Sequence, residues 1–286
     1  MDGQPAIEVR GLRKSYGDLE AVGGIDFRVE RGEVFGLLGP NGAGKTTTVE
    51  ILEGYRARGA GEVSVLGFDP GRRPRELRER VGIVLQQTGI YNHIRVREAL
   101  AHFAGMYPSP RDPDEVIALV GLQGKEKARA RELSGGQVRR LDLGLALVGD
   151  PELIFLDEPT TGFDPAARRN AWATIRSLRD LGKTVLLTTH YLDEAQYLAD
   201  RVAIIKGGNI LAEGAPRELG ADSARRVRIA YRDASGELVE HVTDDPTTLL
   251  HELTSEALAR GERLEDLEVT RPSLEEVYLE LTADEA

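Results

Sequence analysis

The sequence predicts an α/β protein with a mostly parallel core sheet and a small α+β domain at its C-terminal end. Short apolar runs such as residues 153–158 end in polar residues and alternate with helical segments, which is the pattern of a parallel sheet. Residues 6–34 instead alternate apolar and polar positions between glycines, as antiparallel strands do. Past about residue 220 the pattern of predicted strands and helices changes. We therefore expect one domain over residues 1–220 and a second over residues 221–286.

The elements of the first domain follow from these patterns in chain order. Apolar, strand-like runs occupy residues 34–38, 61–67, 81–85, 153–158 and 184–189. Helical segments are expected at residues 46–53, 74–80 and 95–121, the last broken in two by Pro108, Pro110 and Pro113. Gly207 and Gly208 join two further strands as a hairpin. The first domain thus combines a core sheet with an antiparallel β part and a helical part.

The second domain has its own order of elements. Two strands over residues 227–242 turn at residues 233–236 and form a hairpin. A helix near residues 246–260, a strand near 264–270 and an amphipathic helix from Pro272 follow. This part of the chain contains no catalytic constellation, so its expected role is packing or contact.

Composition excludes several classes of function. A chain of 286 residues is long enough to bury a large core. Its net charge of −11, without a basic block, argues against nucleic acid as a partner, because affinity for the phosphate backbone comes from clustered Lys and Arg. The absence of cysteine excludes disulfides and thiolate metal sites. No run approaches the ~20 apolar residues that span a bilayer.

Residues 39–47 read Gly-Pro-Asn-Gly-Ala-Gly-Lys-Thr-Thr and match a phosphate-binding loop between a strand and a helix. Glycines allow the backbone to curl until its N–H groups face an anion, and the helix that follows adds its positive end. The lysine is expected to reach the outer phosphates, the first threonine to ligate Mg²⁺ and the second to donate to an inner phosphate. The expected nucleotide-binding positions are Gly39, Asn41, Gly42, Gly44, Lys45, Thr46 and Thr47.

A second anion site is predicted at residues 133–137. Ser134 is a good helix N-cap, and Gly135 and Gly136 leave bare N–H groups at the positive end of the helix. The alternative is an ordinary cap, which explains the serine but not two glycines where each lowers helix propensity by roughly 1 kcal/mol.

Polar residues follow three apolar strands. The apolar run that begins at residue 153 ends in Asp157 and Glu158. Gln86 follows the run at 81–85, and His190 follows the run at 184–189. A carboxylate at the tip of an apolar strand is costly unless it is paired or binds metal, so Asp157 is expected to hold Mg²⁺ and Glu158 to deprotonate an attacking water. A lone histidine at a strand end is more often structural. Beside the phosphate loop, however, these residues predict one site along a sheet edge.

With these motifs in order, residues 6 to about 218 resemble the ATP-binding subunit of an ABC transporter. The resemblance rests on Tyr16, the loop at 39–47, Gln86, the signature Leu-Ser-Gly-Gly-Gln at 133–137, Asp157, Glu158, Asp164 and His190. Residues 271–282 further resemble the daunorubicin/doxorubicin-resistance type of exporter ATPase. The fold implied is that of a P-loop NTPase.

The resemblance implies ATP and Mg²⁺ as cofactors and a homodimer that sandwiches two ATP molecules head to tail. Ser134, Gly135, Gly136 and Gln137 of one subunit would then face the outer phosphate held by Lys45 of the other. The remaining roles implied are adenine stacking for Tyr16, contact with Mg²⁺ and the attacking water for Gln86, coupling of the two sites for Asp164, and contact with the outer phosphate for His190.

The resemblance also implies an integral membrane permease as partner, with the ATPase cytoplasmic and peripheral on the inner face of the cell membrane. Export of a drug, antibiotic or lipid follows from the family subtype, and import remains an alternative. A soluble ABC ATPase acting on a ribosome or DNA is another, but this chain has one cassette and no basic linker. A non-catalytic nucleotide sensor is a further alternative, against which Glu158 and His190 argue for turnover.

Two positions depart from the family pattern. Phe163 stands where leucine is more common, which is expected to alter only packing in that turn. Gln86 is followed by Gln87 rather than an acidic residue, and Gln86 is preferred because it directly ends the strand.

Overall fold

In the computed structural model, the described residues are 4–84, 89, 91–219, 227–233, 235–270 and 274–282. The chain divides into two compact units, residues 1–212 and 213–286. The sequence-based expectation placed this boundary at residues 220–221. The two units are described separately below.

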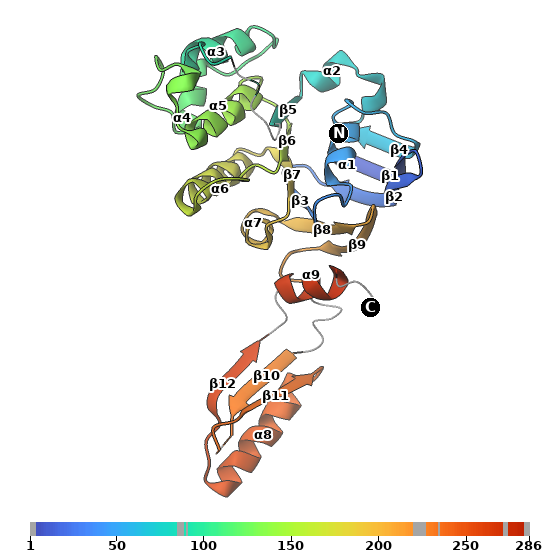
Figure 1. The fold of residues 1–286 in the computed structure, drawn as a ribbon, viewed down its shortest axis with the longest axis vertical. Helices are drawn as coiled ribbons and strands as arrows, with labels where there is room; N and C mark the ends of the chain where they lie inside the picture. The colour runs from blue at the N-terminus through green and yellow to red at the C-terminus, as the bar shows by residue number, and fades with distance from the viewer. Residues whose placement is uncertain are drawn as a thin grey trace. The chain divides into compact units, whose positions relative to one another are not determined.

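A six-stranded sheet forms the centre of the first unit (Figure 1). Its strands lie in the order β5-β6-β7-β3-β8-β9, and the pairs from β5 to β8 are parallel. The residues of β3, β7 and most of β6 are buried, as expected for a sheet covered on both faces. The bounds are β3 Val34–Leu38, β5 Val81–Val84, β6 Leu153–Asp157, β7 Thr184–Thr189, β8 Arg201–Lys206 and β9 Asn209–Gly214.

Helices pack around this sheet with apolar faces inward. One hydrophobic cluster joins α1 and the antiparallel strands to the sheet, and another joins it to α5, α6 and α7. Gly208 follows β8, as the predicted hairpin requires, with a positive φ of 80°. The helices are α1 Lys45–Leu52, α5 Gly135–Leu147, α6 Pro165–Asp180 and α7 Leu192–Leu198.

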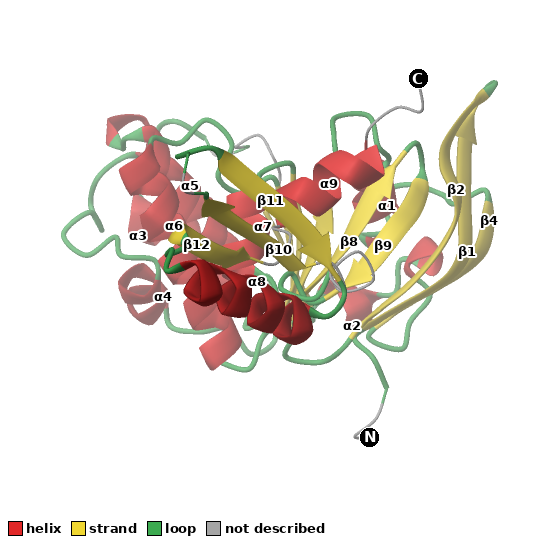
Figure 2. Ribbon diagram, turned by 90° about the horizontal axis from the view of Figure 1, so that it is seen from below, coloured by secondary structure: helices red, strands yellow, loops and turns green. Residues whose placement is uncertain are grey.

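An antiparallel sheet and a helical part complete the first unit. The sheet has the order β2-β1-β4, with β1 Ile7–Tyr16, β2 Leu19–Val29 and β4 Ala60–Val65 (Figure 2). The short α2 Arg75–Arg78 leads into β5. The helical part consists of α3 Val96–Ala104 and α4 Pro113–Leu119 against α5. Gly144 permits this contact, because a Cβ there would meet Leu100, Val116 and Val120 at 3.3–3.5 Å.

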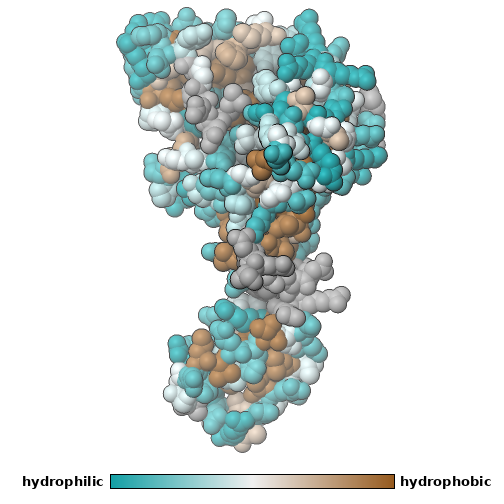
Figure 3. All heavy atoms as spheres, turned by 45° about the vertical axis from the view of Figure 1, so that its right-hand side comes forward, coloured by the Kyte–Doolittle hydropathy of each residue, from teal (hydrophilic) through white to brown (hydrophobic). Residues whose placement is uncertain are grey.

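The second unit is a small α+β structure. Strands β10 Val227–Arg232, β11 Leu238–Thr243 and β12 Glu265–Thr270 form a sheet in the order β11-β10-β12, and α8 Pro246–Arg260 lies along it (Figure 2). Helix α9 spans Leu274–Thr282. Apolar side chains remain on this unit's surface (Figure 3). Leu258, for example, is 76% exposed. The unit also carries the entire net charge of −11, since residues 1–212 contain 29 acidic and 29 basic side chains.

Within the described residues, each helix is too short or too polar to span a bilayer.

Candidate functional site

The phosphate loop lies between β3 and α1, where the sequence predicts it. Gly44 caps α1 with φ 104°, in the left-handed region that favours glycine. A Cβ at Gly44 would lie 2.4 Å from the carbonyl oxygen of Ala21, and a Cβ at Gly39 would lie 2.2 Å from that of Ile205. These close approaches explain why both positions are glycine. The loop backbone curls at the N-terminus of α1, where the first N–H groups of a helix have no intrahelical acceptor and suit an anion.

Lys45 begins α1 and is almost fully buried, with 5% of the residue exposed. Its Nζ donates to the carbonyl oxygens of Gly39 at 2.7 Å and Pro40 at 3.1 Å. Burial lowers the pKa of Lys45, while the charge of Glu158, 3.8 Å from Nζ, acts in the opposite direction. The loop thus holds an ammonium group against the end of the sheet. Thr46 follows and is exposed, and Thr47 is half-buried.

Asp157 ends β6 opposite Thr188 of β7. The Thr188 hydroxyl donates to Oδ1 of Asp157 at 2.5 Å and accepts the backbone N–H of Glu158 at 3.0 Å. Burial raises the pKa of Asp157, and the bond from Thr188 opposes that rise. One buried threonine therefore orients both acidic residues.

The residues at this edge fit a magnesium nucleotide better than a metal held by protein alone. Within the described ranges no group of three or more His, Asp or Glu side chains could hold a metal ion. The edge offers a single strand-end carboxylate, Asp157, and the hydroxyl of Thr46 beside an anion-binding loop. Mg²⁺ in proteins is commonly bound by one or two such groups together with phosphate oxygens and water.

Glu158 lies at the centre of the charged groups. Its φ of 45° is unusual for a residue other than glycine, and its side chain is 12% exposed. Oε1 lies 3.3 Å from Nδ1 of His190 and 3.8 Å from Nζ of Lys45, and Oε2 accepts the Thr161 hydroxyl at 3.1 Å. The structure thus brings together the three chain segments that contain Lys45, Glu158 and His190.

The signature residues form the N-terminus of α5. The Ser134 hydroxyl accepts the backbone N–H of Gln137 at 3.4 Å, and the side chain of Gln137 accepts the backbone N–H of Ser134 at 3.0 Å. Ser134 is therefore a helix N-cap, as both interpretations expected. No other heavy atom lies within 4 Å of a Cβ built on Gly135, so the space above the helix end is open.

This open space belongs to a cavity of about 610 Å³. Its described lining includes Ser134, Gly135, Gly136, Glu158 and Asp164, and no residue of the phosphate loop. Asp164 caps α6 by accepting the N–H groups of Ala166 and Ala167, each at 2.9 Å. Phe163 also lines the cavity. The signature therefore lies beside Glu158 and Asp164 of the same chain.

Tyr16 ends β1 and is 39% exposed. Nζ of Lys14 and the guanidinium of Arg56 lie 5.3 Å and 5.2 Å from its ring centroid. A ring presented at the surface beside two cations is suited to stacking near a polyphosphate. Gln86 and Gln87 lie outside the described residues.

Sequence reasoning missed several residues that support the site. Thr188 faces Asp157 through strand register, and Thr161 reaches Glu158 across a turn. Arg139 of α5 donates to the carbonyl oxygens of Asp157 at 3.1 Å and of Pro159 at 3.2 Å. The pairing of the two predicted strands could have indicated Thr188. No pattern in the residues around Arg139 predicts its contact with the turn after β6.

Comparison with known proteins identifies the family. The ABC transporter family matches residues 22–161. The chain is similar to the daunorubicin resistance ATP-binding protein DrrA3 of Streptomyces coeruleorubidus, with 39% identity over 98% of this chain and 96% of that protein. It is equally similar to the Nod factor export ATP-binding protein I of Rhizobium sp. (strain N33), with 40% identity over 98% of both chains.

Solved structures agree on the fold. An ATP-binding subunit of an ABC transporter superposes with a TM-score of 0.70 and 23% identity over 97% of this chain and 99% of its own. The ATP-binding cassette MJ0796, dimeric and bound to ADP and Pi, gives a TM-score of 0.65 and 22% identity over 73% of this chain and 98% of its own. The predicted P-loop fold, with its core sheet, antiparallel part and helical part, is therefore confirmed. This chain belongs to the ATP-binding proteins of ABC transporters and, as a member of that family, binds and hydrolyses ATP.

Proposed function

We propose that this protein powers the export of a drug, antibiotic or lipid through a separate integral membrane permease, working as a homodimer on the inner face of the membrane. The observation that carries this proposal is an apolar groove between the core sheet and the helical part. ATP turnover at the sheet edge supplies the energy, and the groove receives the permease.

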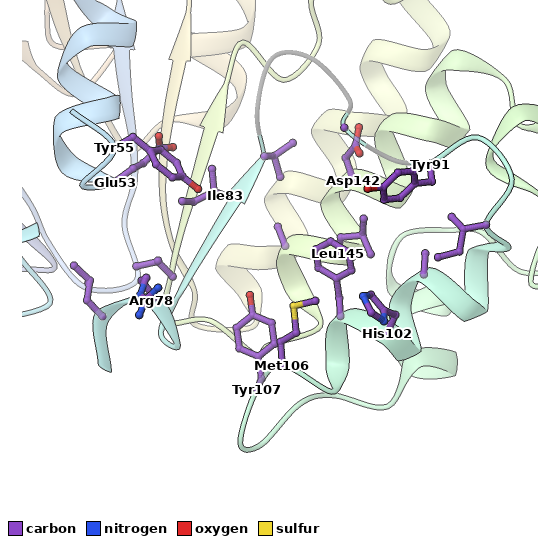
Figure 4. A pocket seen from close by; sticks show the side chains of 18 of the residues that line it. Glu53, Tyr55, Arg78, Ile83, Tyr91, His102, Met106, Tyr107, Asp142 and Leu145 are labelled. Atoms are coloured by element: carbon purple, nitrogen blue, oxygen red, sulfur yellow. The ribbon is translucent and has the colours of Figure 1, made fainter. Parts of the chain in front are cut away.

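The groove has a volume of about 680 Å³ (Figure 4). Its lining comes from the end of α1, from β5, and from helices α3 and α5. Exposed apolar side chains line it, with Tyr91 at 84%, Met106 at 58% and Phe103 at 37% exposure. A monomer rarely leaves aromatic side chains around such a groove without a partner. An apolar segment of the permease fits this lining.

The groove is also well placed to transmit a change at the nucleotide site. Leu52 and Glu53 at the end of α1 line it, and α1 begins at Lys45 of the phosphate loop. Asp142 and Leu145 line it from α5, whose other end carries the signature residues. Movement of either helix when ATP binds would change the shape of the groove. A ligand that binds one of two conformations more tightly shifts the population toward that conformation.

The residues at the sheet edge support a single mechanism of ATP turnover. Phosphates would lie against the loop N–H groups with Lys45 and His190 at the outer phosphate, and Tyr16 would stack on adenine. Glu158 would accept a proton from the attacking water, which is typically worth 10²–10⁴-fold in rate. Mg²⁺, bound by Thr46, Asp157 and Gln86, would neutralise the charge that develops on the phosphates.

A complete site requires two subunits in this proposal. The described lining of the cavity that contains Ser134 and Gly136 includes no residue of the phosphate loop. The partner's phosphate loop would approach this cavity, so that its nucleotide meets the N-terminus of α5 and the turn at Asp164. The dimeric cassette described above supports this arrangement by similarity of fold.

The direction of transport is supported by the extent of similarity. Both relatives described above match 98% of this chain, including the C-terminal unit, and their names describe resistance to daunorubicin and Nod factor export. An importer ATPase and a soluble ABC ATPase acting on ribosomes or DNA are the alternatives, and the names of these two relatives describe neither.

Affinity purification from the native host's membranes tests the proposal. We expect a polytopic membrane protein to co-purify in near-equal amount. Met106→Asp places a charge in the groove and should remove that protein while ATP binding is retained. Leu181→Asp, at a 42% exposed position outside the groove lining, is the matched control and should keep it. Ribosomal or DNA-bound companions without a membrane protein would contradict the proposal.

A further inference from the structure

A buried carboxylate on α7 joins three segments of the first unit. Glu194 is 1% exposed, and its Oε1 accepts the Thr160 hydroxyl at 2.7 Å and the indole N–H of Trp172 at 2.9 Å. Thr160 is fully buried in the turn after Glu158, and Trp172 lies on α6. The mechanism above uses none of these three side chains.

The position of this carboxylate ties together the two segments that contain Glu158 and His190. Thr160 follows Glu158 by two residues, and Glu194 follows His190 by four. The two segments meet twice, at the 3.3 Å contact between Glu158 and His190 and at the buried bond from Thr160 to Glu194. The second contact is shielded from water, so it can hold the geometry of the first, which faces the nucleotide site.

The same turn is also held from the signature helix. Arg139 of α5 donates to the carbonyl oxygens of Asp157 and Pro159 on either side of Glu158. Burial lowers the pKa of Arg139, and the negative charge of Glu194 is among the charges that oppose this. Glu194 is thus one of three acidic side chains, after Asp142 and Asp157, whose charges favour the Arg139 cation, and it binds the turn directly from α7.

A purely structural role explains this arrangement poorly. Oε2 of Glu194 is buried and has no hydrogen-bond partner among the residues that the structure describes. Burial of a carboxylate with an unpartnered oxygen is unfavourable. A glutamine would accept the same two bonds without a buried charge, so the two accepted bonds, and not the charge, define the role that is tested below.

We infer that Glu194 is a positioning residue for ATP hydrolysis, which sets the turn at residues 158–164 relative to His190 through its bonds to Thr160 and Trp172. This inference rests on the proposed roles of Glu158 and His190. Loss of the acceptor would let the turn shift, and small displacements of a catalytic group cost rate far more than they cost binding.

The chain offers an internal probe of this network. Trp172 is the only tryptophan in the sequence, so the intrinsic indole fluorescence comes from one side chain. Its ring stacks on Tyr197 at 5.1 Å and its N–H donates to Glu194. Emission from Trp172 therefore reports directly whether a variant has altered the network.

The test compares Glu194→Ala and Thr160→Val with the conservative variants Glu194→Gln and Thr160→Ser. We expect Glu194→Ala to lower kcat by about 10- to 100-fold, with KM for ATP changed by less than about threefold, and to shift Trp172 emission. Thr160→Val removes one donor without loss of volume and should lower kcat in the same direction. Glu194→Gln and Thr160→Ser keep the bonds and should restore most of kcat and the wild-type emission.

Two results would overturn the inference. One is a Glu194→Ala protein with altered emission and near wild-type kcat, and the other is an equal loss of kcat and ATP binding with lowered thermal stability. If Glu194→Ala does not fold, the same readouts on Thr160→Val against Thr160→Ser decide the matter. Glu158→Gln is assayed in parallel, because undiminished turnover there would reject the proposed catalytic role independently of the network.

Discussion

The imidazole Nδ1 of His190 lies 3.3 Å from the carboxylate of Glu158, although the two residues are 32 positions apart in the sequence. They meet because β6 and β7 are adjacent parallel strands that end at the same edge of the sheet. Lys45 reaches the same carboxylate from the phosphate loop. A carboxylate, an ammonium group and an imidazole thus converge where a nucleotide's outer phosphate is expected to lie.

Replacement of Glu158 by glutamine tests the base directly. Glutamine keeps the size of the side chain but accepts no proton, so we expect ATP hydrolysis to fall by at least about 100-fold while ATP binding is retained. The variant should also accumulate as an ATP-bound dimer, because hydrolysis no longer reopens it. Phosphate release and light scattering with and without ATP measure the two effects. Hydrolysis at the wild-type rate would reject Glu158 as the base.

Thr188→Val tests whether one hydroxyl orients both acidic residues. Valine matches the shape of threonine but removes the donor to Asp157 and the acceptor for the N–H of Glu158. We expect a loss of about 1–3 kcal/mol in the free energy of unfolding, because a buried N–H is left unsatisfied. A fall of about tenfold or more in kcat should accompany it. Thr188→Ser is the control, and equal effects in both variants would contradict the assigned bonds.

Gly44→Ala and Gly42→Ala separate steric overlap from backbone strain in the phosphate loop. Both residues have positive φ, 104° and 79°, but only at Gly44 would a Cβ collide with a carbonyl, that of Ala21 at 2.4 Å. Gly42→Ala should cost about 1–2 kcal/mol of stability. Gly44→Ala should cost more and should also abolish ATP binding, since the loop must move. Urea unfolding and nucleotide titration measure both, and equal stabilities would argue against the collision.

Glu53 gives a pH dependence that can be assigned to one side chain. Burial chiefly, and the nearby charges of Asp157 and Glu50, raise the pKa of Glu53 from 4.5 to about 8. The folded protein therefore keeps a proton that the unfolded chain releases, and the free energy of unfolding falls as pH rises between those values.

Glu53→Gln should remove this dependence. Relative to the wild type, we expect the free energy of unfolding of the variant to be unchanged near pH 4.5. By pH 8 it should be higher by on the order of 1–3 kcal/mol. Denaturant unfolding at several pH values measures it, with Glu76→Gln, on the surface of α2, as the control. A variant with the same pH slope as the wild type would show that Glu53 is not the group responsible.

Much of this architecture is local and therefore predictable. Neighbouring residues alone predict two kinds of element here, because phosphate-loop geometry and strand burial depend on adjacent positions. These are the loop at 39–47 and the strands that precede Asp157 and His190. The parallel order then brings the strand ends together without further information. This is why motifs alone could predict that these segments meet at one edge of the sheet.

The supporting residues could not be predicted in the same way. Arg139, Thr160 and Glu194 act through contacts between elements far apart in the sequence, and no local pattern marks such a contact. Ser134 was predicted as a helix N-cap, but its reciprocal partner Gln137 was not. In the structure the Ser134 hydroxyl and Gln137 satisfy each other's N–H groups, because a capping box lies within the signature itself.

In the proposed function, two copies of this chain share each ATP site. Lys45→Ala lacks the phosphate-loop cation and Ser134→Arg blocks the signature, so each protein alone should be inactive. In a mixed dimer one site combines the intact Lys45 of one chain with the intact Ser134 of the other. We predict that mixing the two purified variants restores ATP hydrolysis to at most about a quarter of the wild-type rate, as expected for random pairing in a two-fold dimer. A mixture as inactive as its separate components, with mixed dimers verified by tag exchange, would contradict the shared site.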